Sequence, residues 1–300
     1  MHKKFAVVSV FILFFCSLFL GIDRFAHRKS LEYSLSTMNS FYQYSDEWNL
    51  PPLSAEDKDQ LDHILGQKFT FFTRGSQAYV FISEDQKYIL KFLNQQKLKP
   101  KTWLAYIPLS FNPYYKQLQQ TQKKCHDTFL SCKTAYLDFK EETGLIYLHL
   151  IPSKQHRKVM LYDKNGDCHL VNLEKTSYFV QNRAQLIFLR ISELMRAGEV
   201  EQAKNIISSV FNLIDHLGKK GVVDNDPVLR RNFGLIHDRA VQIDIGSLRI
   251  DPNSAATLAY KKDIPNITHN FQTWLEKNYP ELLPHFQERL ALILEDLFRN

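Results

Sequence analysis

Three side chains whose oxygen atoms can bind a metal or a proton follow one another late in the chain: Asp226, Asn232 and Asp244. Asp244 ends the strand-like run 240–243 and is followed two residues later by Gly246. A carboxylate in apolar surroundings loses hydration free energy unless a metal or a backbone group binds it. Phosphoryl transfer uses a carboxylate near the attacking hydroxyl, and an Asn and a carboxylate on the magnesium that bridges the phosphates. The order of these residues therefore indicates this chemistry, and the alternative is that Asp244 caps a helix start.

A lysine that could bind phosphate lies earlier in the chain, within a series of short strand-like segments. Residues 69–73, 78–82 and 88–93 are rich in aromatic and β-branched side chains, and the polar turns between them predict an antiparallel meander. The first turn contains Gly75-Ser76. Lys91 alternates with apolar neighbours in the third strand, so we expect its side chain to point into a pocket. The alternative is that Lys91 extends its charged end to solvent from a strand end.

The remaining segments are mostly helical by their pattern of apolar residues. Helices are expected over 55–66 with Ser54 as the N-cap, over 113–135, over 184–217 with a break at 197–198, over 267–278 and over 281–298. Further strands are expected over 145–150, 159–162 and 169–173, with an Asn-Gly turn at 165–166. Strands thus come mainly before helices, which is typical of an α+β chain.

Four short motifs occur in the order that protein kinases use. They are Thr73-Arg74-Gly75-Ser76-Gln77-Ala78-Tyr79-Val80 for the Gly-rich loop, Tyr88-Ile89-Leu90-Lys91-Phe92 for the V-A-I-K strand, Asp226 and Asn232 for the catalytic loop, and Asp244-Ile245-Gly246 for D-F-G. In these motifs residues 66–250 resemble the protein-kinase-like fold. The resemblance implies an α+β, two-lobed domain with an antiparallel sheet in the N-lobe and a helical C-lobe, and it implies ATP and Mg²⁺ as cofactors.

The resemblance also implies a role for each matching residue. Gly75, Ser76, Val80 and Lys91 would bind the nucleotide, with Val80 over the adenine and Lys91 on the phosphates. Asn232 and Asp244 would bind Mg²⁺. Asp226 is the first candidate for the group that accepts or orients the proton of a substrate hydroxyl, and Asp224 is the second.

Several features depart from the kinase pattern. Helix 113–135 contains no Glu that could hold Lys91, and neither His nor Arg precedes Asp226. Residues 224–226 also suit an Asx-rich turn. The sequence therefore leaves two main functions open: phosphoryl transfer from Mg-ATP to a hydroxyl acceptor, or a catalytically inactive, pseudokinase-like scaffold that binds a partner protein. A third interpretation is an unrelated envelope protein.

The N-terminal segment predicts a membrane anchor. Residues 5–22 are uncharged, and a helix of that length, about 27 Å, spans a hydrocarbon core. We therefore expect a single-pass anchor over 1–22, a stalk over 23–60 and a kinase-like domain over 61–300, divided near residue 180 into N-lobe and C-lobe. A cleaved signal peptide is the alternative. Basic residues flank both sides, so charge does not fix the orientation, and the use of ATP predicts a cytoplasmic domain.

The composition excludes some classes of partner. The chain has 300 residues, of which 44% are apolar and 23% charged, with a net charge of +6. Its basic residues are scattered rather than gathered with aromatic side chains, so we expect no nucleic-acid partner. The four cysteines show no zinc-binding spacing. The expected partners are a nucleotide, the membrane through residues 5–22, and a protein.

Overall fold

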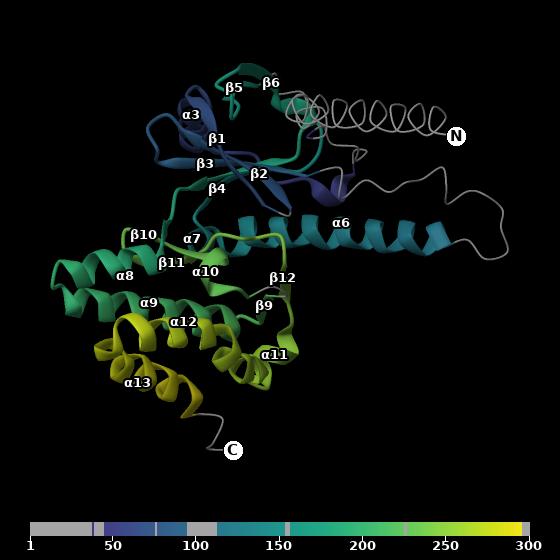
Figure 1. Cartoon of the computed structure of the whole chain (residues 1–300). Helices are drawn as coiled ribbons and strands as arrows, with labels where there is room; N and C mark the ends of the chain where they lie inside the picture. The colour runs from purple at the N-terminus through teal and green to yellow at the C-terminus, as the bar shows by residue number, and fades with distance from the viewer. Residues whose placement is uncertain are drawn as a thin grey trace, which may run out of the picture.

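The chain forms a mixed α/β structure in which a large sheet lies against a mainly helical part (Figure 1). The computed structural model describes Met38 and residues 45–75, 77–94, 113–153, 157–224 and 227–295. In Figure 1 the long helix α6 (Pro113–Asp138) runs between the sheet above it and the helices below it.

Seven strands form the large sheet, in the order β4-β7-β3-β2-β1-β5-β6. Its neighbouring strands are antiparallel except β1 and β5, which are parallel. The strands are β1 (Lys68–Arg74), β2 (Ala78–Ser83), β3 (Tyr88–Leu93), β4 (Leu145–His149), β5 (Lys158–Tyr162), β6 (Cys168–Asn172) and β7 (Tyr178–Asn182). The predicted meander of the first three strands is confirmed.

The two faces of this sheet pack into different cores because successive side chains of a strand point to opposite faces. On one face, Leu90 and Phe92 of β3 join Phe81 and the buried side of helix α3 (Ala55–Leu65). Ser54 caps α3 as expected, since its side chain accepts a hydrogen bond from the backbone N–H of Asp57. On the other face, the sheet packs against α6 and the helical part.

The helical part follows the sheet along the chain. Its helices are α7 (Lys140–Thr143), α8 (Ile187–Arg196), α9 (Val200–Lys219), α10 (Leu229–Asn232), α11 (Pro252–Ala256), α12 (Ile264–Asn278) and α13 (Leu283–Leu294). The predicted break at 197–198 separates α8 from α9, and Gly198 takes a left-handed φ of 78° there. The broad apolar stripe of α9 is buried against its neighbours.

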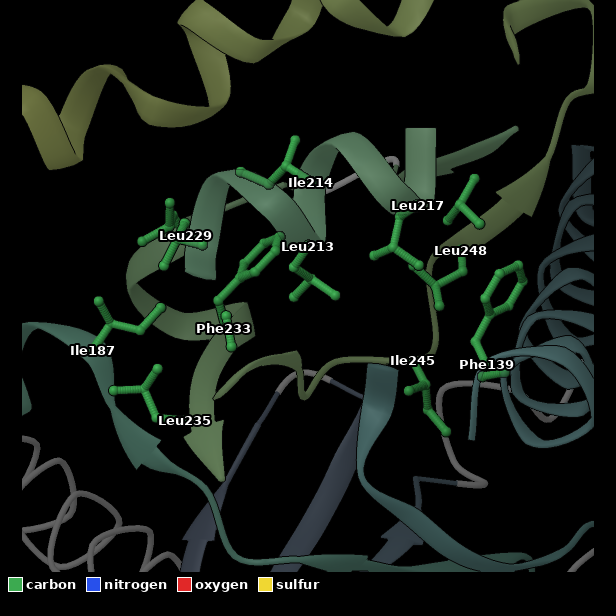
Figure 2. Close-up of a cluster of buried hydrophobic side chains, with 14 of the residues drawn as sticks. Phe139, Ile187, Leu213, Ile214, Leu217, Leu229, Phe233, Leu235, Ile245 and Leu248 are labelled. Carbon is green, nitrogen blue, oxygen red and sulfur yellow. The ribbon is translucent and has the colours of Figure 1, made fainter. Parts of the chain in front are cut away.

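Two small sheets connect the helices to the segment that contains Asp244. Strand β10 (Phe233–Ile236) pairs with β11 (Arg239–Gln242) and with β8 (Gln185–Leu186). Strand β9 (Val222–Asp224) pairs with β12 (Leu248–Ile250). Figure 2 shows the core beneath them, in which Ile245 and Leu248 lie among the same buried side chains as Leu217 and Phe139. Ile245 therefore anchors the segment 243–247 in this core.

The helices of the described residues contradict the predicted membrane-spanning architecture. No helix among them is long and apolar enough to cross a membrane, because the longest, α6 and α9, carry charges along their length, such as Lys123 and Asp215. The predicted fold class, a two-lobed kinase-like domain preceded by a transmembrane helix, and the predicted single-pass location are therefore wrong; the finding is a mixed α/β structure. Residues 1–22, on which the anchor was predicted, lie outside the described residues.

Part of the segment predicted as a stalk packs on the sheet and α6. Trp48 is buried, and its ring meets those of His126 and Phe129 of α6 edge to face. The proposed boundaries between stalk, N-lobe and C-lobe remain predictions.

Candidate functional site

A row of side chains crosses the large sheet on the face toward the helical part. Val80 of β2 lies opposite Lys91 of β3, and Lys91 lies opposite Phe179 of β7. Directly opposite residues of antiparallel strands point to the same face. The register therefore places Val80, Lys91 and Phe179 side by side, and Leu148 of β4 continues the row.

The ammonium group of Lys91 is enclosed, although the residue keeps some exposed surface. Its Nζ donates a hydrogen bond of 2.7 Å to the carbonyl oxygen of Ile243 and lies 5.5 Å from the centre of the Phe179 ring. Burial lowers the pKa of Lys91 from 10.5 to about 8, and the charge of Asp244 opposes this shift. Lys91 therefore stays mostly protonated at neutral pH.

The segment around Asp244 is held by backbone contacts on both sides. The N–H of Ile243 donates to the carbonyl oxygen of Asn232 at 2.7 Å, and Asn232 itself is buried. The N–H of Gly246 donates to Oδ1 of Asp244 at 3.2 Å. Lys91, Asn232 and Asp244 are thus brought together through Ile243, while their assignment to phosphate and metal stays a prediction.

Helix α6 fixes the same segment from a second direction. The Oγ of Ser131 donates to the carbonyl oxygen of Ile245 at 2.5 Å and accepts from the N–H of Leu248 at 2.7 Å. Cys132 is fully buried beside it, and burial, with the Asp244 carboxylate, raises the pKa of its thiol. A neutral thiol therefore lies near Lys91. Ser131 belongs to no recognisable sequence motif, and only its position beside the apolar stripe of α6 indicates burial.

The turn between β1 and β2 lies over this segment. The N–H of Gly75 donates to the carbonyl oxygen of Ala78 at 2.9 Å, which closes the turn. The N–H of Asn94, at the end of β3, donates to the carbonyl oxygen of Gln77 at 2.8 Å. The side chain of Gln77 reaches Gly246, where a Cβ would overlap its Oε1. Ser76 lies outside the described residues.

Of the two candidates for proton transfer, the structure describes Asp224 and not Asp226. Asp226 lies outside the described residues. Asp224 ends β9, where its Oδ2 accepts from Nε2 of Gln242 at 2.6 Å and its Oδ1 accepts from Oγ of Ser247 at 2.6 Å. The two oxygens of Asp224 therefore hold the segments before and after Asp244 in place, which is a positioning role.

Two cavities lie near these elements. One of about 350 Å³ is lined by Asp224 and by residues of α9, η3 (Ala259–Asp263) and α12, including Tyr260 and Asn266. The other, of about 680 Å³, is lined by residues 48–53, Tyr136 and residues 147–153. Lys91 and Asp244 line neither of these two cavities.

A resident metal held by protein side chains alone has no site in the described part of the chain. No group of three or more His, Cys, Asp or Glu side chains there could hold one. Mg²⁺ commonly binds through one or two carboxylates together with substrate phosphates and water. Asp244 and Asn232 match this small number of protein ligands.

Comparison with known proteins gives only distant likenesses. No family model matches the chain, and no curated protein matches it. Among solved structures, the bifunctional kinase-methyltransferase WbdD is similar at 14% identity and a TM-score of 0.32, over 71% of this chain and 42% of the WbdD chain. WaaP in complex with acyl carrier protein is similar at 11% identity and a TM-score of 0.31, over 80% of this chain and 92% of the other.

A third solved structure is that of Rv3197 from Mycobacterium tuberculosis in complex with erythromycin. It is similar at 16% identity and a TM-score of 0.31, over 91% of this chain and 73% of the other. The chain spans less than half the length of the WbdD chains that it matches. Likenesses at TM-scores this low do not establish a shared fold.

Proposed function

We propose that this chain is a divergent kinase-like protein that binds Mg-ATP between the β1–β2 turn and the segment 243–246. One observation carries the proposal: the enclosed ammonium group of Lys91 is hydrogen-bonded to the residue that precedes Asp244. The ammonium group of Lys91 suits the phosphates of a nucleotide, and the carboxylate of Asp244 suits the divalent metal ion that the phosphates carry. The backbone N–H groups of the nearby turn suit the phosphate oxygens as well.

The residues present fit the nucleotide and its metal. Lys91 has three N–H donors, of which the contact with Ile243 uses one, so the others can meet phosphate oxygens. Asp244 and Asn232 would supply the protein oxygens for Mg²⁺. Gly75 and Ser76 would approach the phosphates, and Val80 would cover the base. The magnesium ion supplies charge neutralisation at the phosphates when it is bound.

Nucleotide entry requires the β1–β2 turn to lift. The side chain of Gln77 lies against Gly246, and the ammonium group of Lys91 is satisfied by a backbone carbonyl. The N–H of Gly75 and the carbonyl oxygen of Ala78 close the turn itself, and the N–H of Asn94 ties the turn to the end of β3.

If the protein transfers the phosphoryl group, the acceptor is a hydroxyl compound that approaches from the side of Asp224. Asp226 would then accept or orient the hydroxyl proton, and Asp224 would fix the segment around Asp244. The cavity of about 350 Å³ beside Asp224 lies on that side and supports this direction of approach.

The second candidate function is a pseudokinase-like scaffold that binds a partner protein without catalysis. The neutral thiol of Cys132 beside Lys91 favours it, because no carboxylate from α6 is there to hold the ammonium group toward the phosphates.

Equilibrium dialysis of Mg-ATP against the full-length chain, combined with an assay of ADP formation, separates these functions. A kinase binds ATP and forms ADP with a hydroxyl acceptor, and Asp226→Asn retains binding while ADP formation is lost. Binding without ADP formation for any acceptor supports the scaffold. The absence of saturable binding at millimolar Mg-ATP would overturn the proposal.

A further inference from the structure

Gln77 carries a buried oxygen atom that nothing in the described part of the chain satisfies. Its Oε1 is shielded from solvent and has no hydrogen-bond partner there. The oxygen lies against the Cα of Gly246, and an added Cβ at that position would overlap Gln77 Oε1 and lie 3.6 Å from Asp244 Oδ1. The amide oxygen of Gln77 and the carboxylate of Asp244 therefore face the same side of Gly246.

The position of Gln77 is fixed by its own main chain. Its carbonyl oxygen accepts a hydrogen bond of 2.8 Å from the N–H of Asn94, and Asn94 is only 1% exposed. The Oδ1 of Asn94 is also buried without a partner in the described residues. Two unsatisfied amide oxygens thus lie at one end of the sheet, and leaving such an atom buried without a partner costs free energy. A cost of that kind is typical of a site that is completed by a ligand.

We propose that Gln77 supplies an amide oxygen to the divalent cation held by Asp244. This inference rests on the proposed function and adds a metal ligand to it. Mg²⁺ takes only oxygen ligands in a near-octahedral shell. A neutral amide adds a ligand without adding charge to a cation that already meets Asp244 and the phosphates.

The absence of a side chain at Gly246 belongs to the same arrangement. Gly246 does not have the left-handed φ that would require glycine, so its backbone alone does not exclude alanine. The close approach of Gln77 does, because a Cβ would occupy the place of Oε1. Gly246→Ala therefore displaces the Gln77 amide while it leaves the amide chemically intact.

The test is a Mg²⁺ titration of ATP binding to the full-length chain, with thermal unfolding of the free protein measured in parallel. Gln77→Leu has a similar shape without the oxygen, and Gln77→Glu keeps an oxygen. We expect Gln77→Leu and Gly246→Ala each to raise the Mg²⁺ concentration for half-maximal ATP binding about tenfold, in line with the loss of one metal ligand. Gln77→Glu should leave that concentration unchanged or lower it.

Thermal unfolding distinguishes a ligand from a structural residue. Gln77→Leu removes a buried, unsatisfied oxygen, so the free protein should have a higher Tm than the wild type. Gln202→Leu, an exposed position on α9, is the matched control and should change neither the Mg²⁺ requirement nor the Tm.

Each contrary outcome has a distinct meaning. An unchanged Mg²⁺ requirement in Gln77→Leu, or a lower Tm in that variant, would overturn the inference while the proposed function stands. A raised requirement in Gln77→Glu would also overturn it, because it would show that the amide N–H donates to phosphate instead. If the wild type binds no ATP at any Mg²⁺ concentration, the proposed function fails and the inference fails with it.

Discussion

The Nζ of Lys91 donates a hydrogen bond of 2.7 Å to the carbonyl oxygen of Ile243, across 152 residues of sequence. This bond joins the large sheet to the loop that contains Asp244, and it places a buried cation next to a carboxylate. Ile243 in turn donates its N–H to Asn232. The candidate site is therefore a single connected unit of backbone and side-chain contacts.

The pKa of Lys91 predicts how nucleotide binding depends on pH. In the free protein Lys91 is protonated below pH 8 and neutral above it. Because the phosphates need the ammonium form, the Mg-ATP affinity should be constant from neutral pH to about 8 and then fall up to about tenfold per pH unit. Calorimetric titration over this range measures the fall. An affinity that stays constant well above pH 8 would show that Lys91 does not meet the phosphates.

The same pKa predicts the pH dependence of stability in the free protein. The pKa of Lys91 is lower in the folded protein than in the unfolded chain, so between about 8 and 10.5 the unfolded chain binds more protons. The free energy of unfolding should therefore rise as pH rises through this range. Lys91→Met should remove this rise, and Lys87→Met, on the exposed turn before β3, should retain it. Urea unfolding at several pH values measures both.

Ser131 should be important for stability and for the position of Asp244. Ser131→Ala removes the partner of the Leu248 N–H and the 2.5 Å bond to the Ile245 carbonyl, which keeps a long contact of 4.0 Å from Sγ of Cys132. An unsatisfied buried group costs about 1–3 kcal/mol, so we expect a loss of at least that size in the free energy of unfolding, with weaker Mg-ATP binding.

Ser192→Ala provides the control for this prediction. Its Oγ bonds only the Phe188 carbonyl one turn earlier in α8, so its loss should change the unfolding free energy little. Equal effects of the two variants in urea unfolding would refute the role assigned to Ser131.

We expect that the close packing around Gly234 excludes any larger residue at this position. A Cβ at this position would lie 2.7 Å from Cβ of Ala184 and 3.1 Å from the carbonyl oxygen of Gln185, and the backbone there cannot yield cheaply. Gly234→Ala should therefore destabilise the fold by about 1–3 kcal/mol. At Gly75 a Cβ would meet only the Ala78 carbonyl oxygen at 3.7 Å, so Gly75→Ala should unfold like the wild type. A stable Gly234→Ala variant would mean that β10 and the 184–185 segment are farther apart than described.

Local sequence signals predicted most elements but not the contacts that join them. The N-cap at Ser54 and the alternation around Lys91 are readable because capping and strand periodicity depend on near neighbours. The bond from Lys91 to Ile243, the support from Ser131 and the approach of Gln77 to Gly246 depend on packing between distant segments, which no local pattern records. The apolar run 5–22 gave the membrane prediction, and the described helices did not support it.

The most direct test of the account is a calorimetric titration of Mg-ATP into the full-length protein and into Asp244→Asn. Asp238→Asn is the matched control, because Asp238 lies in the exposed turn between β10 and β11 and pairs with Arg190. We expect saturable, magnesium-dependent binding in the wild type and in Asp238→Asn, and its loss in Asp244→Asn. No binding in the wild type, or equal binding in Asp244→Asn, would contradict a nucleotide site at Lys91 and Asp244.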